Sequence, residues 1–156
     1  MVYIFDTSSF RVMDHYFPDH FPSFWQDFEA SIQNGEILSA REVFNELIKQ
    51  GIRPHLLEWV KSNKNIFLMA SDDDGLFISK IFAVPHFQLL VSEKERLKGS
   101  PVADPFVIAA AKTRDGSVVT EEKPKANAPN IPNVCEHFKI ACCNLEAFMS
   151  SKGWAY

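Results

Sequence analysis

The stretch VYIFDTSSF (residues 2–10) begins with four apolar, strand-forming residues and then changes abruptly to Asp6 and three hydroxyl side chains. A short run of β-branched and aromatic residues that ends in turn-forming residues predicts a buried strand over residues 2–5. In open α/β sheets, ligands bind beyond the carboxyl ends of the strands. Asp6, which follows such an end, is therefore the first candidate site residue.

The rest of the chain alternates between strand and helix patterns. Apolar residues at helical spacing predict helices, and short apolar runs bounded by turn residues predict strands. Predicted helices cover residues 21–35, 41–51, 54–62, two pieces of 71–98 broken near Pro85, 102–112 and 145–152; predicted strands cover 36–40, 65–70, 116–120 and 139–142, with a loop over 121–134. This alternation predicts an α/β fold, a three-layer sandwich with a mainly parallel central sheet.

The length and composition of the chain predict a single domain that spans residues 1–156, because a chain of this length can bury a sizeable core without stabilising cross-links. The net charge of −4 argues against a generally basic surface that binds nucleic acid. An anionic substrate therefore has to be attracted locally, by a metal ion or a basic patch. Three cysteines without a C-x-x-C pair favour a reduced, cytoplasmic compartment. No apolar run approaches the roughly 20 residues that span a membrane.

Acidic residues recur where strands are predicted to end. Asp6 follows the first strand, and Glu121 and Glu122 follow residues 116–120. Asp104 opens the predicted buried helix before that second strand. Carboxylates that are distant in sequence could therefore converge on one edge of the sheet.

Each acid also has a structural explanation. Asp6 could form a turn with the hydroxyl residues after it. Asp104 before Pro105 matches a helix N-cap followed by proline at the first helical position. Glu121 and Glu122 could belong to a solvated loop.

Two further acids, Glu42 and Glu46, lie on the predicted helix 41–51. Ser39 and Glu42 form the S-x-x-E pattern of a capping box, which assigns Glu42 a structural role. Glu46 has no such role and lies nearer the apolar face of the helix. Glu46 is therefore the candidate site residue of the pair.

Carboxylates that are held close together repel one another, and a divalent cation relieves this repulsion. Mg²⁺ and Mn²⁺ are hard ions that prefer carboxylate and water oxygens. Such ions can activate water for phosphodiester cleavage. The pattern of acids therefore predicts a site for Mg²⁺ or Mn²⁺.

Five motifs carry a resemblance to a known family. The segments IFDTSSF (4–10), VFNEL (43–47), ADPFVIAAA (103–111) and VVTEE (118–122) resemble, in order and spacing, the motifs of the PIN-domain ribonucleases, many of which are toxins of toxin–antitoxin pairs of the VapC type. The segment IPNVCEHF (131–138) is similar to a PIN-like branch of otherwise undefined function. The resemblance covers nearly the whole chain.

The resemblance assigns the catalytic and metal-binding roles of the family to Asp6, Glu46 and Asp104. The fourth acid corresponds to Glu122, where the family usually has Thr-x-Asp. A glutamate at this place leaves the fourth ligand, and the number of ions, open. Glu121 is the alternative fourth acid.

The same resemblance implies further properties. Ser8 and Thr120 match the positions that orient the acids. The implied activity is metal-dependent cleavage of single-stranded RNA by a PIN-like toxin, and the implied partner is a cognate antitoxin protein. Members of the family are often dimers, so a homodimer is a further expectation. Apart from the resemblance, five basic residues could contact RNA phosphates if their segments border the acidic edge, or could form a solvated charged surface instead: Lys94, Arg96, Lys98, Lys123 and Lys125.

Two alternatives stay open. A strand that ends in aspartate is also typical of haloacid-dehalogenase-like phosphatases, but these need an acid two places later, where this chain has Ser8. The other alternative is a PIN-like module that binds RNA or protein and has lost full metal affinity, which the glutamate at position 122 favours. The acidic run after Ser71 is read as a capped helix start, because a calcium loop from Asp72 would need an acid where Ala83 lies.

Overall fold

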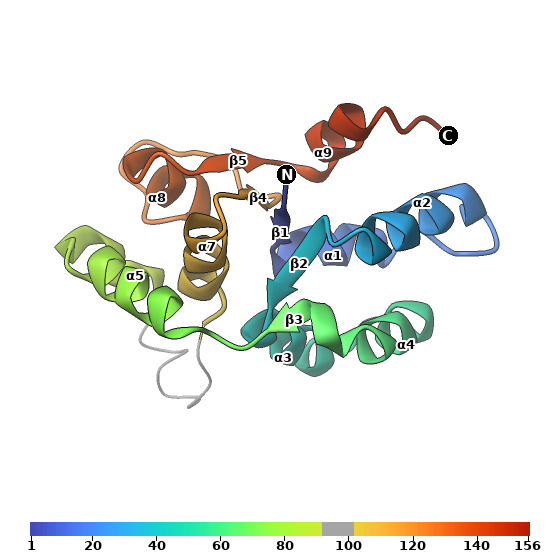
Figure 1. The fold of residues 1–156 in the computed structure, drawn as a ribbon, viewed down its shortest axis with the longest axis horizontal. Coiled ribbons are helices and arrows are strands. Elements are labelled where there is room, and N and C mark those ends of the chain that lie inside the picture. The colour runs from blue at the N-terminus through green and yellow to red at the C-terminus, as the bar shows by residue number, and fades with distance from the viewer. Residues whose placement is uncertain (92–101) are drawn as a thin grey trace.

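A computed structural model of the chain describes residues 1–91 and 102–156 (Figure 1). In these residues a sheet of parallel strands has the order β3-β2-β1-β4-β5. The strands are β1 (Tyr3–Phe5), β2 (Ile37–Ala40), β3 (Phe67–Leu68), β4 (Ser117–Val119) and β5 (Ala141–Cys143). The predicted α/β class with a parallel central sheet is thereby confirmed.

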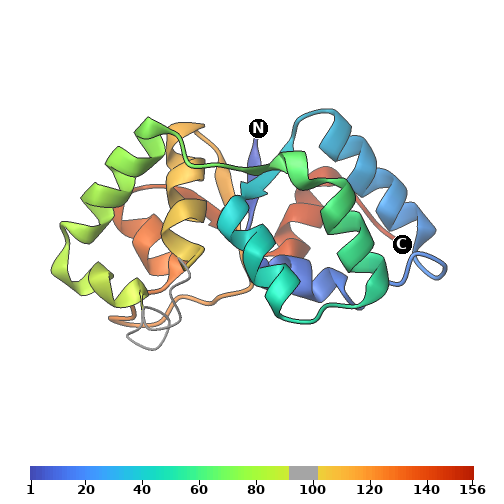
Figure 2. The ribbon, with the colours of Figure 1, turned by 90° about the horizontal axis from the view of Figure 1, so that it is seen from below.

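Helices cover both sides of the sheet. Those described are α1 (Thr7–Met13), α2 (Pro22–Gln33), α3 (Arg41–Lys49), α4 (Pro54–Ser62), α5 (Asp72–Phe82), α7 (Asp104–Thr113), α8 (Ile131–His137) and α9 (Leu145–Lys152), with short 3₁₀ turns at Lys64–Ile66 and Pro85–Leu90. Figures 1 and 2 show α5, α7 and α8 on one side of the sheet and α1, α2 and α4 on the other. This is the three-layer arrangement that the strand and helix alternation predicts.

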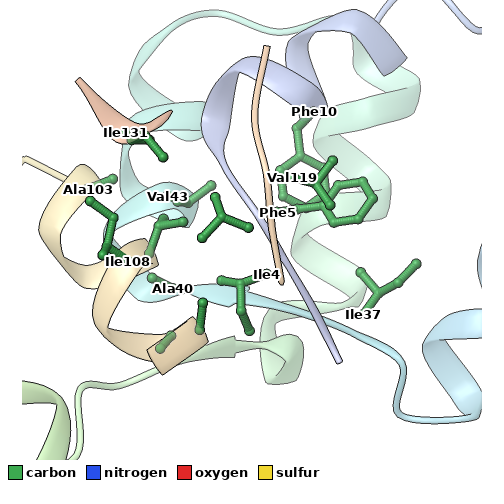
Figure 3. Close-up of a cluster of buried hydrophobic side chains, with 14 of the residues drawn as sticks. Ile4, Phe5, Phe10, Ile37, Ala40, Val43, Ala103, Ile108, Val119 and Ile131 are labelled. Atoms are coloured by element: carbon green, nitrogen blue, oxygen red, sulfur yellow. The ribbon is translucent and has the colours of Figure 1, made fainter. Parts of the chain in front are cut away.

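The core lies on both faces of the central strand β1. Ile4 and Phe5 are fully buried, and consecutive strand residues point to opposite faces of a sheet. Figure 3 shows Phe5 together with Phe10, whereas Ala103 and Ile108 of the α7 segment lie apart from them. Each side of the sheet therefore has its own apolar layer.

The strand register brings the ends of β1 and β4 to the same level. Phe5 is the partner of Val119, and the backbone N–H of Asp6 donates to the Val119 carbonyl at 2.9 Å. Asp6 and Thr120 are therefore the first residues beyond two adjacent strand ends. This is the edge at which a parallel sheet binds ligands.

Two helices differ from the sequence prediction. Residues 7–13 form α1 where turn residues were expected, and α8 begins at Ile131 inside the predicted loop 121–134. Pro132 lies in the first turn of α8, where a missing N–H costs nothing, and the Asn130 side chain accepts the Asn133 N–H as a cap. The prolines of this segment thus start a helix rather than prevent one.

The C-terminal end of α3 and the start of α5 follow their sequence signals. Gly51, after α3, has φ 69, the left-handed backbone that glycine adopts readily. Ser71 and Asp74 form the capping box of α5. The predicted helical pieces over 71–98 are observed as α5 and the turn Pro85–Leu90, while residues 92–98 lie outside the described part of the chain. No helix within residues 1–91 and 102–156 is long and apolar enough to cross a membrane.

Candidate functional site

Asp6 lies immediately after β1 and is almost completely buried, with 3% of its surface exposed. Its Oδ2 atom accepts hydrogen bonds from the Ser8 hydroxyl at 2.8 Å and the Thr120 hydroxyl at 2.9 Å. Burial raises the pKa of the Asp6 carboxyl, and the hydrogen bonds from Ser8 and Thr120 oppose this rise. Asp6 is therefore a carboxyl group that the fold removes from water and positions with two hydroxyl donors.

Glu46 is held between the segments that carry two of the other predicted acids, Asp6 and Asp104. Its Oε2 atom accepts the Thr7 hydroxyl at 2.6 Å, and its Oε1 atom accepts the Ala103 N–H at 3.1 Å. Thr7 directly follows Asp6, and Ala103 directly precedes Asp104. The contacts of this one side chain therefore bring Asp6, Glu46 and Asp104 into one neighbourhood.

Asp104 is the first residue of α7 and is partly exposed. The N-cap position is occupied by Ala103, which makes no side-chain cap bond, so the expectation that Asp104 caps this helix is wrong. A carboxylate in the first turn still interacts favourably with the positive end of the helix dipole. The charge of Asp104 thus lies where the helix backbone favours it.

The two glutamates after β4 have different partners. Glu121 accepts the Leu145 N–H at 2.8 Å through Oε1, and the Ser9 hydroxyl lies 3.4 Å from the same atom. Glu122 accepts the Ile131 N–H at 2.9 Å through Oε2. Burial raises the pKa of Glu122, and the charges of Asp6 and Glu46 raise it further. The Glu122 carboxylate therefore lies within the electric field of Asp6 and Glu46.

Ser8 and Thr120 link the two strand ends. The Ser8 hydroxyl accepts the Glu121 N–H at 2.9 Å, and the Thr120 hydroxyl accepts the Glu122 N–H at 3.2 Å. The two hydroxyl oxygens lie 3.2 Å apart. Both side chains therefore contact Asp6 and the backbone of the segment that carries Glu122.

The expected capping box at the start of α3 does not form. The N-cap of α3 is Ala40, and the Ser39 hydroxyl instead donates to the Phe5 carbonyl at 2.6 Å. Glu42 is left with a buried Oε2 atom that has no hydrogen-bond partner. Burial raises the pKa of Glu42, with smaller contributions from the charges of Asp74 and Glu46. Sequence reasoning missed this residue because the S-x-x-E pattern supplied a structural role for it.

Thr7 is another residue that sequence reasoning did not single out. It is nearly buried and donates the short hydrogen bond to Glu46. The run of hydroxyl residues after Asp6 is the available signal, but such residues are equally typical of turns. Its contact with Glu46 depends on α1 packing beside α3, which the sequence pattern does not reveal.

The donor set fits Mg²⁺ or Mn²⁺ in kind, because it consists of carboxylate oxygens. Its spacing does not form a cage in this structure. Within residues 1–91 and 102–156, no three side chains of His, Cys, Asp or Glu are grouped closely enough to hold an ion. Hydrogen bonds from Thr7, Ala103 and Ile131 hold the two glutamates against the protein instead.

An open pocket of about 420 Å³ adjoins the acids at the ends of β4 and β5. Its lining includes Thr120, Glu122, Lys123 and Cys142. Lys123 is thus a cation beside the acidic edge. The pocket is large enough for a small polar group, and its lining is mixed in charge.

The parallel sheet, its order and its helical layers are consistent with a PIN-like fold. The solved structure of VapBC2 from Rickettsia felis bound to a DNA fragment from their promoter is similar, with a TM-score of 0.52 and 14% sequence identity over 92% of this chain and 98% of that chain. Likeness at this identity describes the fold alone.

The chain belongs to the family described as Domain of unknown function (DUF4411), whose sequence profile matches residues 3–156. No curated protein shows significant similarity to it.

Proposed function

We propose that this protein is an endoribonuclease that cleaves single-stranded RNA with the help of Mg²⁺ or Mn²⁺. The observation that carries the proposal is the position of Glu46, whose carboxylate is bound by the neighbours of Asp6 and Asp104 at the carboxyl edge of a parallel sheet. The motif resemblance to PIN-domain ribonucleases and the PIN-like fold support the same activity.

In this proposal Asp6, Glu46, Asp104 and Glu122 would hold the metal. When bound, the ion would supply activation of water and stabilisation of the leaving oxygen of a phosphodiester. The chain's own groups orient the site, because Ser8 and Thr120 fix the Asp6 carboxylate through Oδ2. Lys123 and Lys125 lie on the segment after β4 and supply cations for RNA phosphates.

Cleavage of labelled single-stranded RNA with Mn²⁺ and with a chelator tests the activity. Wild-type protein is expected to cut only with the metal, while Asp6→Asn and Asp104→Asn reduce cleavage to background. Asp73→Asn is the matched control, because Asp73 is an exposed aspartate on α5 and is not one of the proposed metal-binding acids. Equal cleavage by all four proteins would indicate a contaminating nuclease and remove the assignment.

A toxin role with a cognate antitoxin is part of the same proposal. It rests on the resemblance to toxin–antitoxin nucleases and on the similar fold of VapBC2. Expression of wild-type protein is expected to arrest growth of a bacterial host, and expression of Asp6→Asn is not. Growth arrest by both the wild-type protein and Asp6→Asn would contradict the toxin role.

A homodimer is proposed on the same resemblance, and sedimentation of the purified protein measures the oligomeric state.

A PIN-like binding module with weakened metal affinity is the second candidate. It is favoured by the glutamate at position 122 and by the absence of a formed ion cage among the described residues. Calorimetric titration with Mn²⁺ separates the two candidates. Saturable binding that Asp6→Asn abolishes supports the nuclease, whereas no saturable binding supports the module.

A further inference from the structure

A second pocket is lined by residues of α2 and α4, two helices on the side of the sheet opposite to α5, α7 and α8 (Figures 1 and 2). Its volume is about 250 Å³. The lining comprises Trp25 and Glu29 of α2, His55 and Trp59 of α4, and Pro18 of the loop before α2. Each helix contributes two residues four positions apart, which share one helix face. None of these residues belongs to the acidic edge of the sheet.

Three aromatic rings form the wall of this pocket. The centroid of the Trp25 ring lies 6.0 Å from that of Trp59 and 6.1 Å from that of His55. The interplanar angles are 54° and 83°, so Trp25 does not stack face to face with either ring. The rings therefore meet as inclined walls of one concave surface.

The rings offer carbon surface to this pocket, because their N–H groups are occupied or covered. The Trp25 Nε1–H donates to the Tyr16 carbonyl at 2.6 Å. The Nε1 atom of Trp59 and the Nε2 atom of His55 are buried. All three aromatic residues are nevertheless partly exposed, so what a ligand meets is mainly the π surface of the rings. Such a surface is electronegative and attracts cations.

Glu29 adds a negative charge beside the rings. Its Oε1 atom accepts the Gln33 side-chain amide at 3.5 Å, which is long for a hydrogen bond, and the residue is partly exposed. No lysine or arginine is among the described residues that line the pocket. The pocket therefore attracts positive charge and disfavours phosphate and other anions.

The loop that carries Pro18 is held in place on both sides of this residue. Arg53, directly before α4, donates to Asp14 through its backbone N–H and through Nη1, each at 2.8 Å. Trp25 holds Tyr16 of the same loop. A pocket that is formed before its ligand arrives loses less conformational entropy on binding.

We propose that this pocket binds a small organic cation of the alkylammonium class, such as a trimethylammonium group. The methyl groups of this cation carry part of its positive charge, so they suit aromatic faces and a nearby carboxylate at the same time. The proposal does not rest on the proposed nuclease function, because no lining residue is among the proposed metal-binding acids. The same head group occurs on free molecules such as choline and on methylated lysine side chains.

Nuclear magnetic resonance titration of the isotope-labelled, full-length protein with choline tests the proposal. The chain has three tryptophans, and Trp154 packs against Phe24 and Phe148 without lining the pocket. The indole N–H signals of Trp25 and Trp59 are expected to shift saturably, while the Trp154 signal stays in place. The same spectra show whether each protein is folded.

The charge of the ligand is tested with the neutral carbon isostere of choline, in which a tert-butyl group replaces the trimethylammonium group. This alcohol has nearly the same shape and is expected to bind at least about tenfold more weakly. Glu29→Gln is expected to weaken choline binding about threefold. Glu58→Gln is the matched control, because Glu58 is exposed on α4 outside the lining and its replacement is expected to change nothing.

A short peptide that carries trimethyllysine is titrated in parallel. Tighter binding of this peptide than of choline would identify a protein side chain as the source of the cation, and tighter binding of choline would identify a free molecule. Three results would overturn the proposal: no saturable shift with either cation, equal binding of choline and its neutral isostere, and choline binding that Glu29→Gln leaves unchanged.

Discussion

At the scale of single residues, the candidate site is a set of carboxylates held by hydroxyl and backbone donors. Asp6 is buried by β1 and its neighbours, and its Oδ2 atom depends on Ser8 and Thr120. A buried carboxylate that loses a hydrogen-bond donor destabilises the folded protein, because water cannot reach it to replace the lost hydrogen bond. The small hydroxyl residues around the acids are therefore as important to the structure of this edge as the acids themselves.

Replacing Thr120 with valine tests this dependence. Valine keeps the shape of threonine but removes the donor to Asp6 and the acceptor of the Glu122 N–H. The expected loss in the free energy of unfolding is about 1–3 kcal/mol. Urea denaturation measures it, and Thr120→Ser, which keeps the hydroxyl, is expected to lose less. Equal losses for the two variants would show that packing of the methyl group, not the hydrogen bonds, is what matters.

The sequence predicts the acids as site residues from local signals: a strand end for Asp6 and Glu122, a helix start for Asp104, and a place near the apolar face of its helix for Glu46. Their role as site residues stays a prediction. The family resemblance also predicts Ser8 and Thr120 beside the acids, and both hydroxyls donate to Asp6.

The partners of the two glutamates are not predicted. The Thr7 hydroxyl, the Ala103 N–H and the Ile131 N–H contact Glu46 or Glu122 only when the folded chain brings distant segments together. Ala103 and Ile131 donate their backbone N–H groups, so their side-chain types give no indication of these contacts.

At the scale of elements, α5 and α7 are joined by a buried carboxylate. Asp74 completes the capping box of α5 and also accepts the Thr113 hydroxyl at 2.6 Å, with Arg114 at 3.3 Å. Burial alone raises the pKa of the Asp74 carboxyl, but hydrogen bonds from Thr113 and Ser71 and the charge of Arg114 outweigh it. The pKa is therefore lower than its ordinary value.

Asp74→Ala is expected to lower the free energy of unfolding by about 3 kcal/mol at neutral pH, because it leaves Arg114 without its buried partner. Asp73→Ala, in the same helical turn but exposed, is expected to cost less than about 1 kcal/mol. Urea denaturation of both variants provides the comparison.

The pH dependence follows from the lowered pKa of Asp74. Its contribution to stability is fully present above the unfolded value of 3.8 and is lost as the pH falls through the lower folded value. The gap between wild type and Asp74→Ala is therefore expected to narrow in acid. A gap that widens on acidification would contradict the lowered pKa.

Two glycines differ in the space that a larger side chain would find, and their replacement by alanine is expected to have opposite effects on stability. A Cβ atom at Gly116, before β4, would lie 2.6 Å from the Val2 carbonyl oxygen, whereas one at Gly75 in α5 would meet nothing within 4 Å. Gly116→Ala is expected to cost about 1–3 kcal/mol through overpacking. Gly75→Ala is expected to gain about 0.5–1 kcal/mol, because alanine is the better helix former. Thermal denaturation ranks the variants, and a stable Gly116→Ala protein would mean that the start of β4 can shift.

The elements that sequence reasoning recognised and those it missed differ in a physical way. Residues 54–62 have Pro54 at the helix start, where proline is favoured, and match α4. Helices α1 and α8 begin with residues that also form turns, Thr7 and Ser8 in one case and Pro132 in the other. Tertiary packing decides such segments, since Phe10 and Val134 are buried only in the folded molecule.

At the scale of the whole molecule, aromatic side chains connect the layers around β1. The Phe5 ring lies 5.5 Å from Phe10 of α1, 5.6 Å from Phe28 of α2 and 5.1 Å from Phe148 of α9. One strand residue therefore contacts three helices. The chain has 14 phenylalanines, and the four of this cluster are all buried in the core.

Phe5→Ala is expected to lower the free energy of unfolding by about 3–5 kcal/mol, because it leaves a cavity where three helices meet the sheet. Phe21→Ala is the control, since Phe21 is 41% exposed beside α2. Urea denaturation measures the free energy of unfolding of both variants, and the slope of that free energy against urea concentration is expected to stay unchanged. A similar small loss for the two variants would contradict the central role of Phe5.

The strand order has a consequence for synthesis. Strand β1 lies between β2, which follows early in the chain, and β4, which is made from residues 117–119. On the ribosome, the nascent chain therefore exposes one edge of β1 until most of the polypeptide has emerged, and pairing between such distant segments is slow. Asp6 gains Thr120 only at that late step. If the protein is a ribonuclease, the growing polypeptide stays harmless to its own messenger while translation proceeds.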